Sequence, residues 1–528
     1  MRMNIRMPDQ TSVIIEGGGP ISDSAGRGIS LSCDITPDNG LKVSVRAGST
    51  PLQYILLRWN FSDGDIPTGS VKVLGDEWER AYGTMEWRSI NPDVFMPWYF
   101  FITNSSDLSD NPERRTCAFG VKVRPNALCF WNLDSAGVTL WIDIRNGAKG
   151  VILDGRTLEA ATVVFGDYSG MSAFEAARNF CKAMCTDGIF PKEPVYGSNN
   201  WYYAYGNSSH EEIVRDASIV AEYTNGLKVR PYMVIDDGWQ PNNCDGPWHC
   251  GNAKFPDMKK LAEEIAAMDV KPGIWIRFLA DVRRTSPNVK DEWRLQRDAS
   301  FLDPSCPEVL AHVKADTKRI IDWGYKLIKH DYSTFDMFGD WGMNRPKSLA
   351  GEPQPGKEWS FWDRNRTSAE IVLDFYKAIR EAAGDAVIIG CNTISHLCAG
   401  LVEVNRTGDD TSGKDWLRTR KFGVNTLAFR LPQNDIFYKA DADCVGITEL
   451  VPWEKNRLWL KALAISGSPL FVSCKPGVLN AEQEAELKEA FAINSVQNDT
   501  LVPLDWTETT CPQKWLHNGK VVTFPWFE

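Results

Sequence analysis

The sequence predicts an α/β protein in which a (β/α)8 TIM barrel follows an N-terminal antiparallel β-sandwich and precedes a short C-terminal β region. After about residue 195, eight short apolar runs alternate with amphipathic stretches, a pattern typical of repeated βα units. Before that point, short alternating segments are separated by Gly, Pro, Asn and Asp turns. The 528 residues also exceed the size at which one core keeps growing. The expected domains are residues 1–185, 186–494 and 495–528.

The N-terminal part has the alternation of half-buried strands. Segments such as LKVSVRA, YILLRWNF and GVTLWIDIRN place apolar residues at every second position. This spacing puts the apolar side chains on one face of each strand. We therefore expect two antiparallel sheets that pack face to face.

The barrel prediction depends on eight apolar runs, each a candidate strand. They are residues 195–201, 231–237, 271–278, 325–331, 386–392, 401–406, 435–443 and 468–473. Helices are expected between most of them and after the last, at 209–224, 257–268, 307–323, 367–383, 454–466 and 480–492. The gap between 392 and 401 is too short for a full helix. A doubly wound open sheet would give the same alternation and stays an alternative.

Composition and charge exclude several classes of function. The net charge is -11 and no block of basic residues is present, so nucleic acid is not expected as a partner. No apolar stretch of about 18 residues occurs, so no membrane span is expected. The start, MRMNIRMPDQ, lacks the apolar run of a signal peptide, which favours a cytoplasmic location; a periplasmic one requires a leader that has been removed. The 13 Cys lack the spacing of a zinc site, and we expect neither a metal nor a cofactor.

Acidic residues close four of the eight runs. They are the pair Asp236 and Asp237, Asp331, the pair Asp409 and Asp410 just after the sixth run, and Asp441 with Asp443. In a (β/α)8 barrel the active site is built at the C-terminal ends of the strands. One such Asp could simply cap a helix, but several buried carboxylates at one end are costly unless they are paired or used.

Paired carboxylates are the residues that cleave glycosidic bonds, one as an acid and the other as a nucleophile. Lys329 lies two residues before Asp331 on the same strand face, so it favours the ionised carboxylate of a nucleophile, although a structural ion pair would look the same. Asp410 lies beside Asp409, whose like charge would raise its pKa and suit an acid. Asp409 is the rival for that role.

Three motifs in these positions resemble glycoside hydrolase families 27 and 36, the α-galactosidase clan of melibiase-like enzymes. They are YMVIDDGWQ, IKHDYS and NRTGDD, with FPDMKKLAEEIAAMDVKPGIW between the first two. The resemblance covers roughly residues 195 to 475. It implies that Asp331 is the nucleophile and that Asp410, four residues after Arg406, is the acid/base.

The resemblance also implies a sugar-binding set. Asp236 and Asp237 would accept hydrogen bonds from sugar hydroxyls, and Trp201 would line the same pocket unless it is a core residue. The other residues expected at the substrate are Lys329, Arg406, Trp275 and Asn392.

The chain departs from the family pattern in two places that bear on the sugar. Asn392 stands where family 27 enzymes have an acid, in CNTISHLCAGLVEVNR. The third run ends IRFLAD, which leaves Arg277 and Asp281 as unassigned candidates.

The implied function is a retaining, exo-acting α-galactosidase that works by double displacement through a covalent glycosyl-aspartate. Three alternatives stay within carbohydrate chemistry: a transglycosylase of the raffinose-synthase kind, a hydrolase for α-N-acetylgalactosamine or β-L-arabinopyranose, and a non-catalytic sugar-binding protein. A barrel enzyme that uses Mg2+ held by the strand-end acids is another class. The expected partner is an oligosaccharide or glycoside, and a homo-oligomer is an open expectation.

Overall fold

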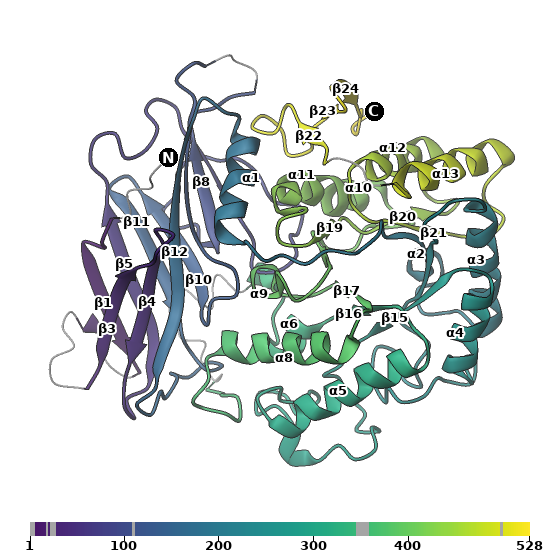
Figure 1. Cartoon of the computed structure of the whole chain (residues 1–528), viewed down its shortest axis with the longest axis horizontal. Coiled ribbons are helices and arrows are strands. Elements are labelled where there is room, and N and C mark those ends of the chain that lie inside the picture. The colour runs from purple at the N-terminus through teal and green to yellow at the C-terminus, as the bar shows by residue number, and fades with distance from the viewer. Residues whose placement is uncertain (1–5, 17–19, 22–27, 108–110, 345–357, 497–499) are drawn as a thin grey trace.

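Three groups of β-sheets, with helices that cover mainly the parallel one, build the chain (Figure 1). The computed structural model describes residues 6–16, 20–21, 28–107, 111–344, 358–496 and 500–528. In Figure 1 the antiparallel sheets lie on the left, the parallel sheet with its helices on the right, and the small C-terminal sheet at the top. The three sheet groups follow one another along the chain in the predicted order. The exact domain boundaries stay a prediction.

Two six-stranded antiparallel sheets form the N-terminal part. The first contains, in spatial order, β2 (Pro20–Ile21), β1 (Gln10–Ile15), β5 (Leu52–Asn60), β11 (Gly137–Asp143), β10 (Leu128–Asp134) and β7 (Met96–Pro97). The second contains β3 (Ser30–Ile35), β4 (Leu41–Arg46), β12 (Thr157–Ser169), β9 (Arg115–Val121), β8 (Tyr99–Thr103) and β6 (Lys72–Gly75). Aromatic side chains join them: Trp59 of β5 meets Phe165 of β12 edge to face at 5.4 Å.

The end of the predicted sandwich segment is a helix. Helix α1 (Ala173–Met184) begins with a capping box between Ser172 and Glu175. Its buried residues recur with helical rather than strand spacing, as Ala173, Ala177, Phe180 and Met184 show. The helix packs against β9 on one side and against the 3-10 turn η4 (Leu431–Gln433) on the other, so it joins the two halves of the molecule.

Nine parallel strands form one curled sheet. In spatial order they are β19 (Lys439–Asp441), β18 (Val404–Arg406), β17 (Val387–Gly390), β16 (Leu327–His330), β15 (Lys271–Ile276), β14 (Tyr232–Ile235), β13 (Tyr196–Asn199), β21 (Leu470–Cys474) and β20 (Cys444–Ile447). Each predicted run contains a strand. The seventh run contains only β19, because Ala442 and Asp443 leave the strand conformation before β20 begins.

The sheet is therefore an incompletely closed barrel. Its edge strands β19 and β20 follow each other in the chain, yet β19 pairs with β18 and β20 pairs with β21. Asp443, at the break, has a φ of 71°, which turns the chain away from β-geometry. The prediction of a barrel is confirmed in part. The strands follow the predicted order, but the hydrogen bonding between strands is interrupted between β19 and β20.

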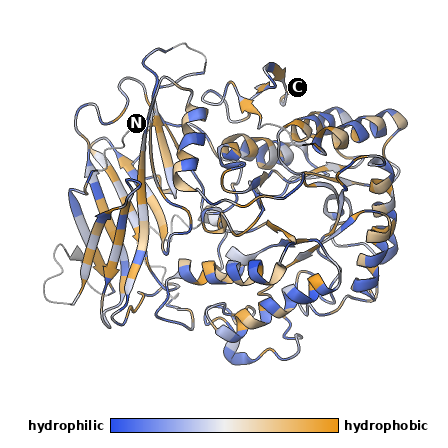
Figure 2. Cartoon of the chain, viewed as in Figure 1, coloured by the Kyte–Doolittle hydropathy of each residue, from blue (hydrophilic) through white to orange (hydrophobic). Residues whose placement is uncertain are grey.

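Six long helices cover the parallel sheet close to their predicted positions. They are α3 (His210–Tyr223), α4 (Met258–Ala267), α5 (Pro307–Asp322), α8 (Ser368–Ala383), α12 (Trp453–Ile465) and α13 (Ala481–Asn494). Figure 2 shows most of them with a hydrophilic and a hydrophobic side, as expected for helices that cover a core. Between β17 and β18 the chain forms only α9 (Ser395–Cys398), in line with the short gap in the sequence.

Shorter elements complete this part of the chain. Near the strand ends are α2 (Trp201–Ala204), η1 (Asp291–Trp293), α6 (Ser333–Phe338) and η2 (Gly342–Asn344). Between β18 and β19 lie α10 (Trp416–Thr419), the short π-helix η3 (Arg420–Asn425) and α11 (Thr426–Arg430) before η4.

The C-terminal residues form a three-stranded antiparallel sheet, as predicted. Its strands are β22 (Val502–Pro503), β23 (Lys514–His517) and β24 (Lys520–Thr523). Trp506, between β22 and β23, packs edge to face on Trp87 of the N-terminal part at 5.3 Å and on Phe174 of α1 at 5.3 Å. The small sheet is thus attached to the N-terminal part by aromatic contacts.

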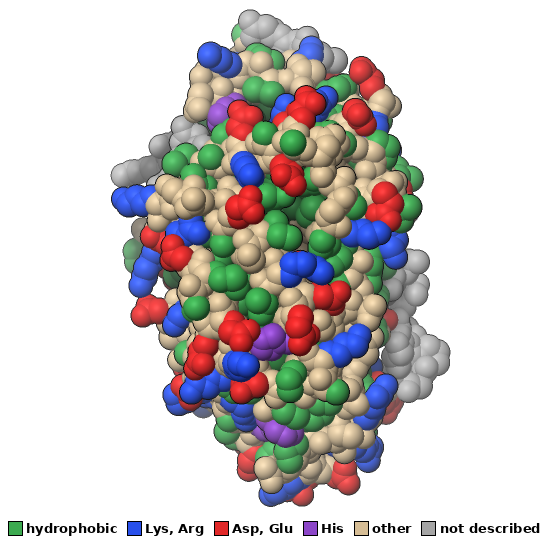
Figure 3. Space-filling model, turned by 90° about the vertical axis from the view of Figure 1, so that its right-hand side faces the viewer, with side chains coloured by type: hydrophobic (Ala, Val, Ile, Leu, Met, Phe, Trp, Pro, Cys, Tyr) green, Lys and Arg blue, Asp and Glu red, His purple; other side chains and the backbone are tan. Residues whose placement is uncertain are grey.

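Several global properties concern possible partners. Acidic and basic side chains intermingle on the face in Figure 3. Within the described ranges, no helix is long and apolar enough to cross a membrane. Over the same residues, no cluster of three or more His, Cys, Asp or Glu has the arrangement of a metal site. The 13 cysteines are free thiols.

Candidate active site

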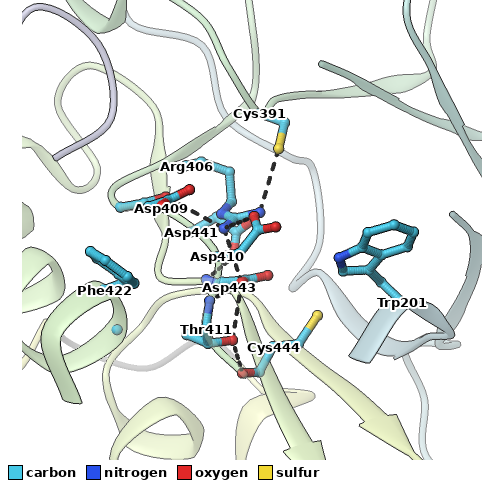
Figure 4. Close-up of polar contacts among 12 residues, drawn as sticks. Trp201, Cys391, Arg406, Asp409, Asp410, Thr411, Phe422, Asp441, Asp443 and Cys444 are labelled. Carbon is cyan, nitrogen blue, oxygen red and sulfur yellow. Dashed lines mark hydrogen bonds and ion pairs between the residues drawn. The ribbon is translucent and has the colours of Figure 1, made fainter. Parts of the chain in front are cut away.

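The parallel strands end in register and bring their acids to one end of the sheet. Ile276 pairs with His330, His330 with Gly390, and Arg406 with Asp441. The residues that follow these positions therefore lie at the same edge. Figure 4 shows Asp409, Asp410, Asp441 and Asp443 gathered around the Arg406 side chain.

Asp331 directly follows β16 and receives uncharged hydrogen-bond donors. The indole Nε1 of Trp275 donates to its Oδ2 at 3.2 Å, and the backbone N of Tyr332 donates to its Oδ1 at 2.7 Å. Its own N donates to the carbonyl of Ile276 at 3.0 Å. Tyr332 has a φ of 63°, a conformation that is costly for an aromatic residue and is often found at functional sites.

Lys329 forms its ion pair with Asp236 rather than with Asp331. Its Nζ lies 2.7 Å from Asp236 Oδ2, and the amide of Asn199 donates to the same oxygen at 2.7 Å. Burial by itself would lower the pKa of Lys329, but the carboxylate of Asp236 beside it helps to hold that pKa well above its usual value. The Lys329 side chain points into the barrel, and there it pairs with Asp236, which follows β14.

Asp237 turns toward the loop that follows β14. Gln240 donates its side-chain amide to Asp237 Oδ1, and the backbone N of Cys244 donates to the same oxygen at 3.0 Å. Burial raises the pKa of Asp237 despite these hydrogen bonds.

Asp410 is surrounded by cations. Its Oδ1 lies 3.3 Å from Arg406 Nη2 and 3.8 Å from Arg80 Nη1. Burial alone would raise the pKa of Asp410, but Arg406, Arg80, Lys329 and Arg418 together hold it below its usual value. The expectation of a raised pKa is wrong for the protein without substrate, because these cations outweigh the like charge of Asp409.

Asp409 forms shorter ion pairs than Asp410 and is less exposed. Arg80 Nη2 lies 3.0 Å from one of its oxygens and Arg418 Nη2 lies 3.2 Å from the other. Its side chain is 18% exposed, against 34% for Asp410. Of the two neighbours, Asp410 is therefore the carboxylate that is more open to a substrate.

Arg406 contacts residues that follow three neighbouring strands, β17, β18 and β19. It is buried, with its Nη2 at 2.9 Å from Asp443 Oδ2 and its Nη1 at 3.4 Å from the sulfur of Cys391. Burial and the charge of Asp331 both raise the pKa of the Cys391 thiol, so Cys391 lies within the electrostatic reach of Asp331. Burial also raises the pKa of Asp441 to about 6.

A loop of the N-terminal part supplies a residue that no sequence pattern indicated. The loop carries Arg80, and the backbone on either side of Gly408 holds it: Ala81 N donates to Thr407 O at 2.8 Å, and Asp409 N donates to Ala81 O at 2.9 Å. Arg80 lies far from Asp410 in sequence and belongs to no motif. The only sequence signal is an acidic and basic cluster, DEWER, in an otherwise apolar stretch.

The remaining predicted residues differ in how they are placed. The Asn392 amide is engaged, since its Nδ2 donates to Glu79 at 2.6 Å and its Oδ1 accepts from Phe335 N at 3.3 Å. Trp201 begins α2, and Figure 4 shows its indole directed toward the carboxylate cluster. Trp201 therefore faces the group of acids, whereas the Asn392 side chain is held by Glu79 and the backbone of Phe335.

The two unassigned candidates, Arg277 and Asp281, have different surroundings. Arg277 stacks on the Tyr332 ring at 4.2 Å and forms an ion pair of 2.6 Å with Asp336, so it supports the residue that follows Asp331. Asp281 pairs with Arg294 at 2.7 Å and accepts from the backbone N of Thr285, so it holds a loop.

Comparison of the sequence with protein-family models gives no match, and none of the curated proteins matches either. The fold does match solved structures. The α-galactosidase TtGalA from Thermus thermophilus has a TM-score of 0.61 at 16% identity, over 98% of this chain and 99% of its own. The galactosidase domain of the α-galactosidase-sucrose kinase AgaSK has a TM-score of 0.61 at 16% identity, over 98% of this chain and 74% of its own.

A third match is the GH36 α-galactosidase AgaA from Geobacillus stearothermophilus, with a TM-score of 0.60 at 13% identity, over 97% of this chain and 79% of its own. Structures of TtGalA contain p-nitrophenyl α-D-galactopyranoside or stachyose. The resemblance predicted from the three motifs is thus confirmed at the level of the fold, which spans nearly the whole chain.

Proposed function

We propose that this chain is a retaining glycoside hydrolase of the α-galactosidase type, with Asp331 as nucleophile and Asp410 as acid/base. The observation that carries the proposal is the single charged cluster at the C-terminal ends of the parallel strands. Arg406 contacts both Asp410 and Cys391, and the charge of Asp331 acts on Cys391. These contacts support the assignment of the two carboxylates to one site.

The geometry of Asp331 suits nucleophilic attack. A nucleophilic carboxylate must be ionised and held in one orientation. The hydrogen bonds from Trp275 and Tyr332 fix both of its oxygens without neutralising the negative charge. In the first step Asp331 bonds to the anomeric carbon as the bond to the leaving oxygen breaks.

Asp410 would supply the proton of that step and recover it in the next. Its proton passes to the leaving oxygen, which takes the electron pair of the broken bond. Asp410, then ionised, removes a proton from water, and the resulting hydroxyl group attacks the glycosyl-enzyme and releases Asp331. Two inversions retain the configuration of the sugar.

Asp236 and Asp237 would bind the sugar itself. Both are buried at the end of β14, and in each carboxylate one oxygen accepts a hydrogen bond from the amide of a neighbouring side chain. A sugar hydroxyl would donate to these carboxylates, which form stronger hydrogen bonds than neutral acceptors. The galactosides in the TtGalA structures support α-galactose as the first sugar to test.

A panel of p-nitrophenyl glycosides tests the proposal. The panel comprises the α-galactopyranoside, the α-N-acetylgalactosaminide and the β-L-arabinopyranoside, which share an axial hydroxyl. We expect the α-galactopyranoside to be hydrolysed fastest, with α-galactose as the first anomer seen by NMR. β-Galactose as the first anomer would contradict the retaining mechanism, and sugar binding without hydrolysis of any glycoside would contradict an enzyme.

A further inference from the structure

Arg80 belongs to the N-terminal part, and its side chain lies next to Asp409 and Asp410, the acids that follow β18. Its two terminal nitrogens lie 3.0 Å from Asp409 and 3.8 Å from Asp410, and the residue is 7% exposed. Its guanidinium lies over the rings of Trp341 at 5.3 Å and Tyr82 at 5.9 Å. Cation–π contacts of this kind hold a guanidinium in place without neutralising it.

The loop that carries Arg80 is fixed on both sides. Glu79 accepts from Asn392 Nδ2 at 2.6 Å and from Gly342 N at 2.8 Å, while Ala81 bridges the backbone around Gly408. These contacts come from the loops after β16, β17 and β18. Arg80 therefore has a defined position relative to Asp410, although it comes from a different part of the fold.

We propose that Arg80 is a positioning residue for the acid/base step, which orients Asp410 and keeps it ionised in the protein without substrate, so that it limits which leaving groups the site can release. This inference rests on the proposed function. It makes the N-terminal part a contributor to the chemistry as well as to stability.

Other charged and titratable groups also face Asp410 from the surrounding elements. They are Arg406 on β18, Asp409 beside it, Asp443 after β19, Lys329 on β16, Arg418 on α10, and Tyr202 and Tyr205 on or just after α2. Most of these cations have a second partner or solvent. Arg406 pairs with Asp443, Lys329 pairs with Asp236, and the Arg418 side chain is 41% exposed.

Arg80 is buried, as Arg406 and Lys329 are, but it differs from them because it belongs to the N-terminal part. Asp409 is shared between Arg80 and Arg418, so one carboxylate faces two guanidinium groups. Asp409 thus anchors the cations, and an excess of positive charge remains for Asp410. Removing Arg80 would take away a buried charge that solvent screens little.

The chemical consequence concerns the leaving group. A leaving oxygen that is a weak base, such as p-nitrophenolate, departs with little help from a proton. An alkoxide or a sugar hydroxyl departs only if Asp410 is protonated and donates. With Asp410 ionised at neutral pH, we expect the protein to favour activated glycosides there and to gain activity on unactivated ones at acidic pH.

The test uses two neutral variants of the full chain, Arg80→Met, which keeps the packing between the two rings, and Arg80→Gln. Arg80→Lys, which keeps the charge, is the conservative variant. The matched control is Arg124→Gln, because Arg124 also connects the N-terminal part to the barrel through Ala399 O and Asp187 but lies outside the site. Each variant is first checked for folding by its thermal unfolding midpoint.

Two readouts are compared. The first is the titration of the Asp410 carboxyl by 13C NMR, with its signal assigned from its loss in Asp410→Asn. The second is the pH profile of kcat/KM for p-nitrophenyl and methyl α-galactoside. Since an opposite charge within about 4–6 Å lowers an Asp pKa by about 1–3 units, the neutral variants should titrate about one pH unit higher. In the pH profile of kcat/KM for methyl α-galactoside, the basic limb of the neutral variants should shift to higher pH by the same amount. Arg80→Lys and Arg124→Gln should resemble the wild type in both readouts.

The outcomes separate this inference from the proposed function. An unchanged Asp410 titration in either folded neutral variant would overturn the role of Arg80, whatever the activity. A shifted titration with equal shifts for both substrates would overturn the link to the leaving group. Absence of hydrolysis by a wild-type protein whose Asp410 titrates as expected would overturn the proposed function, and with it the catalytic part of the inference.

Discussion

The two proposed catalytic carboxylates lie in contrasting surroundings. Asp331 receives uncharged donors from its own loop and from the neighbouring strand β15, through Tyr332 and Trp275. Asp410 instead faces guanidinium groups from β18, from α10 and from the N-terminal loop that carries Arg80. One environment orients a carboxylate, and the other stabilises its charge.

This contrast indicates how the two halves of the mechanism are controlled. A nucleophile needs orientation, which two hydrogen bonds from adjacent backbone and side chain provide. An acid/base needs a tuned pKa, which depends on the total charge around it. We infer that the barrel strands alone define the first property and that the second requires the N-terminal part as well.

The largest effect is expected for Asp331→Ala, which tests the first half of the comparison directly. Without the nucleophile, hydrolysis of p-nitrophenyl α-galactoside should fall by roughly four orders of magnitude or more. Azide should partly restore it, because the small anion fits the space of the lost carboxylate and attacks in its place. The rate with and without azide is followed by p-nitrophenolate absorbance.

The control for this prediction is Asp385→Asn. Asp385 precedes β17 at the opposite end of the strand from the site, is 94% exposed, and pairs with Lys192. It should retain wild-type activity. Undiminished hydrolysis by Asp331→Ala would remove Asp331 from the mechanism and with it the comparison.

The next effect is expected for Asp410→Asn, and it depends on the substrate. General acid catalysis contributes roughly 100- to 10,000-fold, so hydrolysis of methyl α-galactoside should fall by about that factor. The p-nitrophenyl substrate should lose less in its first step, since its leaving group needs little protonation. Steady-state kcat/KM on both substrates measures the difference.

Asp409→Asn is the matched variant for Asp410→Asn. It removes the adjacent charge and loosens Arg80 and Arg418, so some loss is expected, but of a similar size on both substrates. If Asp409→Asn shows the stronger dependence on the leaving group, Asp409 is the acid and the assignment must be exchanged.

The same contrast explains what the sequence could and could not predict. Strand periodicity is local, so the apolar run 325–331 was enough to predict β16 and to place Asp331 at its end. The helices near 307–323 and 367–383 were predicted for the same reason, because the pattern of a stretch is local as well. Features that depend on neighbouring residues were therefore accessible.

Features that depend on tertiary contacts were not. The predicted partner of Lys329 was Asp331, because they share a strand face, but the curled sheet brings Asp236 within 2.7 Å. The pKa of Asp410 was expected to rise because only Asp409 is near it in sequence. The cation of Arg80 reaches it through the packing of the N-terminal part on the barrel, which no periodicity encodes.

A smaller effect is expected for Trp275→Phe, which sharpens the description of the Asp331 environment. The change keeps an aromatic ring and removes the N–H that donates to Asp331 Oδ2 at 3.2 Å. A hydrogen bond to a charged group contributes about 1.5–3 kcal/mol, so a loss of kcat/KM of about 10- to 150-fold is expected on both substrates. The loss should not depend on the leaving group, because Asp331 gives no proton.

Trp453→Phe is the control, since Trp453 donates its indole N–H to Glu486 at the same distance of 3.2 Å on the outside of the barrel. This variant should keep wild-type kinetics. A loss for Trp275→Phe that is larger on methyl than on p-nitrophenyl α-galactoside would mean that the environments of the two acids are coupled rather than separate.

The smallest effect on activity is expected for Asp441→Asn, which tests how far the excess positive charge extends from Asp410. Asp441 is buried and its pKa is raised to about 6, even though Arg406 is near, because burial outweighs the cation there. A folded-state pKa above the unfolded value of about 3.8 means that Asp441 favours folding at low pH and that this contribution is lost as pH rises through about 6. The neutral Asn variant keeps the acceptor for Asp443 N and lacks this loss.

Thermal unfolding of both proteins from pH 4 to pH 8 measures the effect. The Asn variant should gain stability relative to the wild type across the interval from about pH 4 to pH 6, by about 1–3 kcal/mol in the free energy of unfolding. A difference that does not change with pH would mean that Asp441 is ionised throughout, and hence that the positive charge around Asp410 extends to the whole group of acids rather than to the one carboxylate that Arg80 contacts.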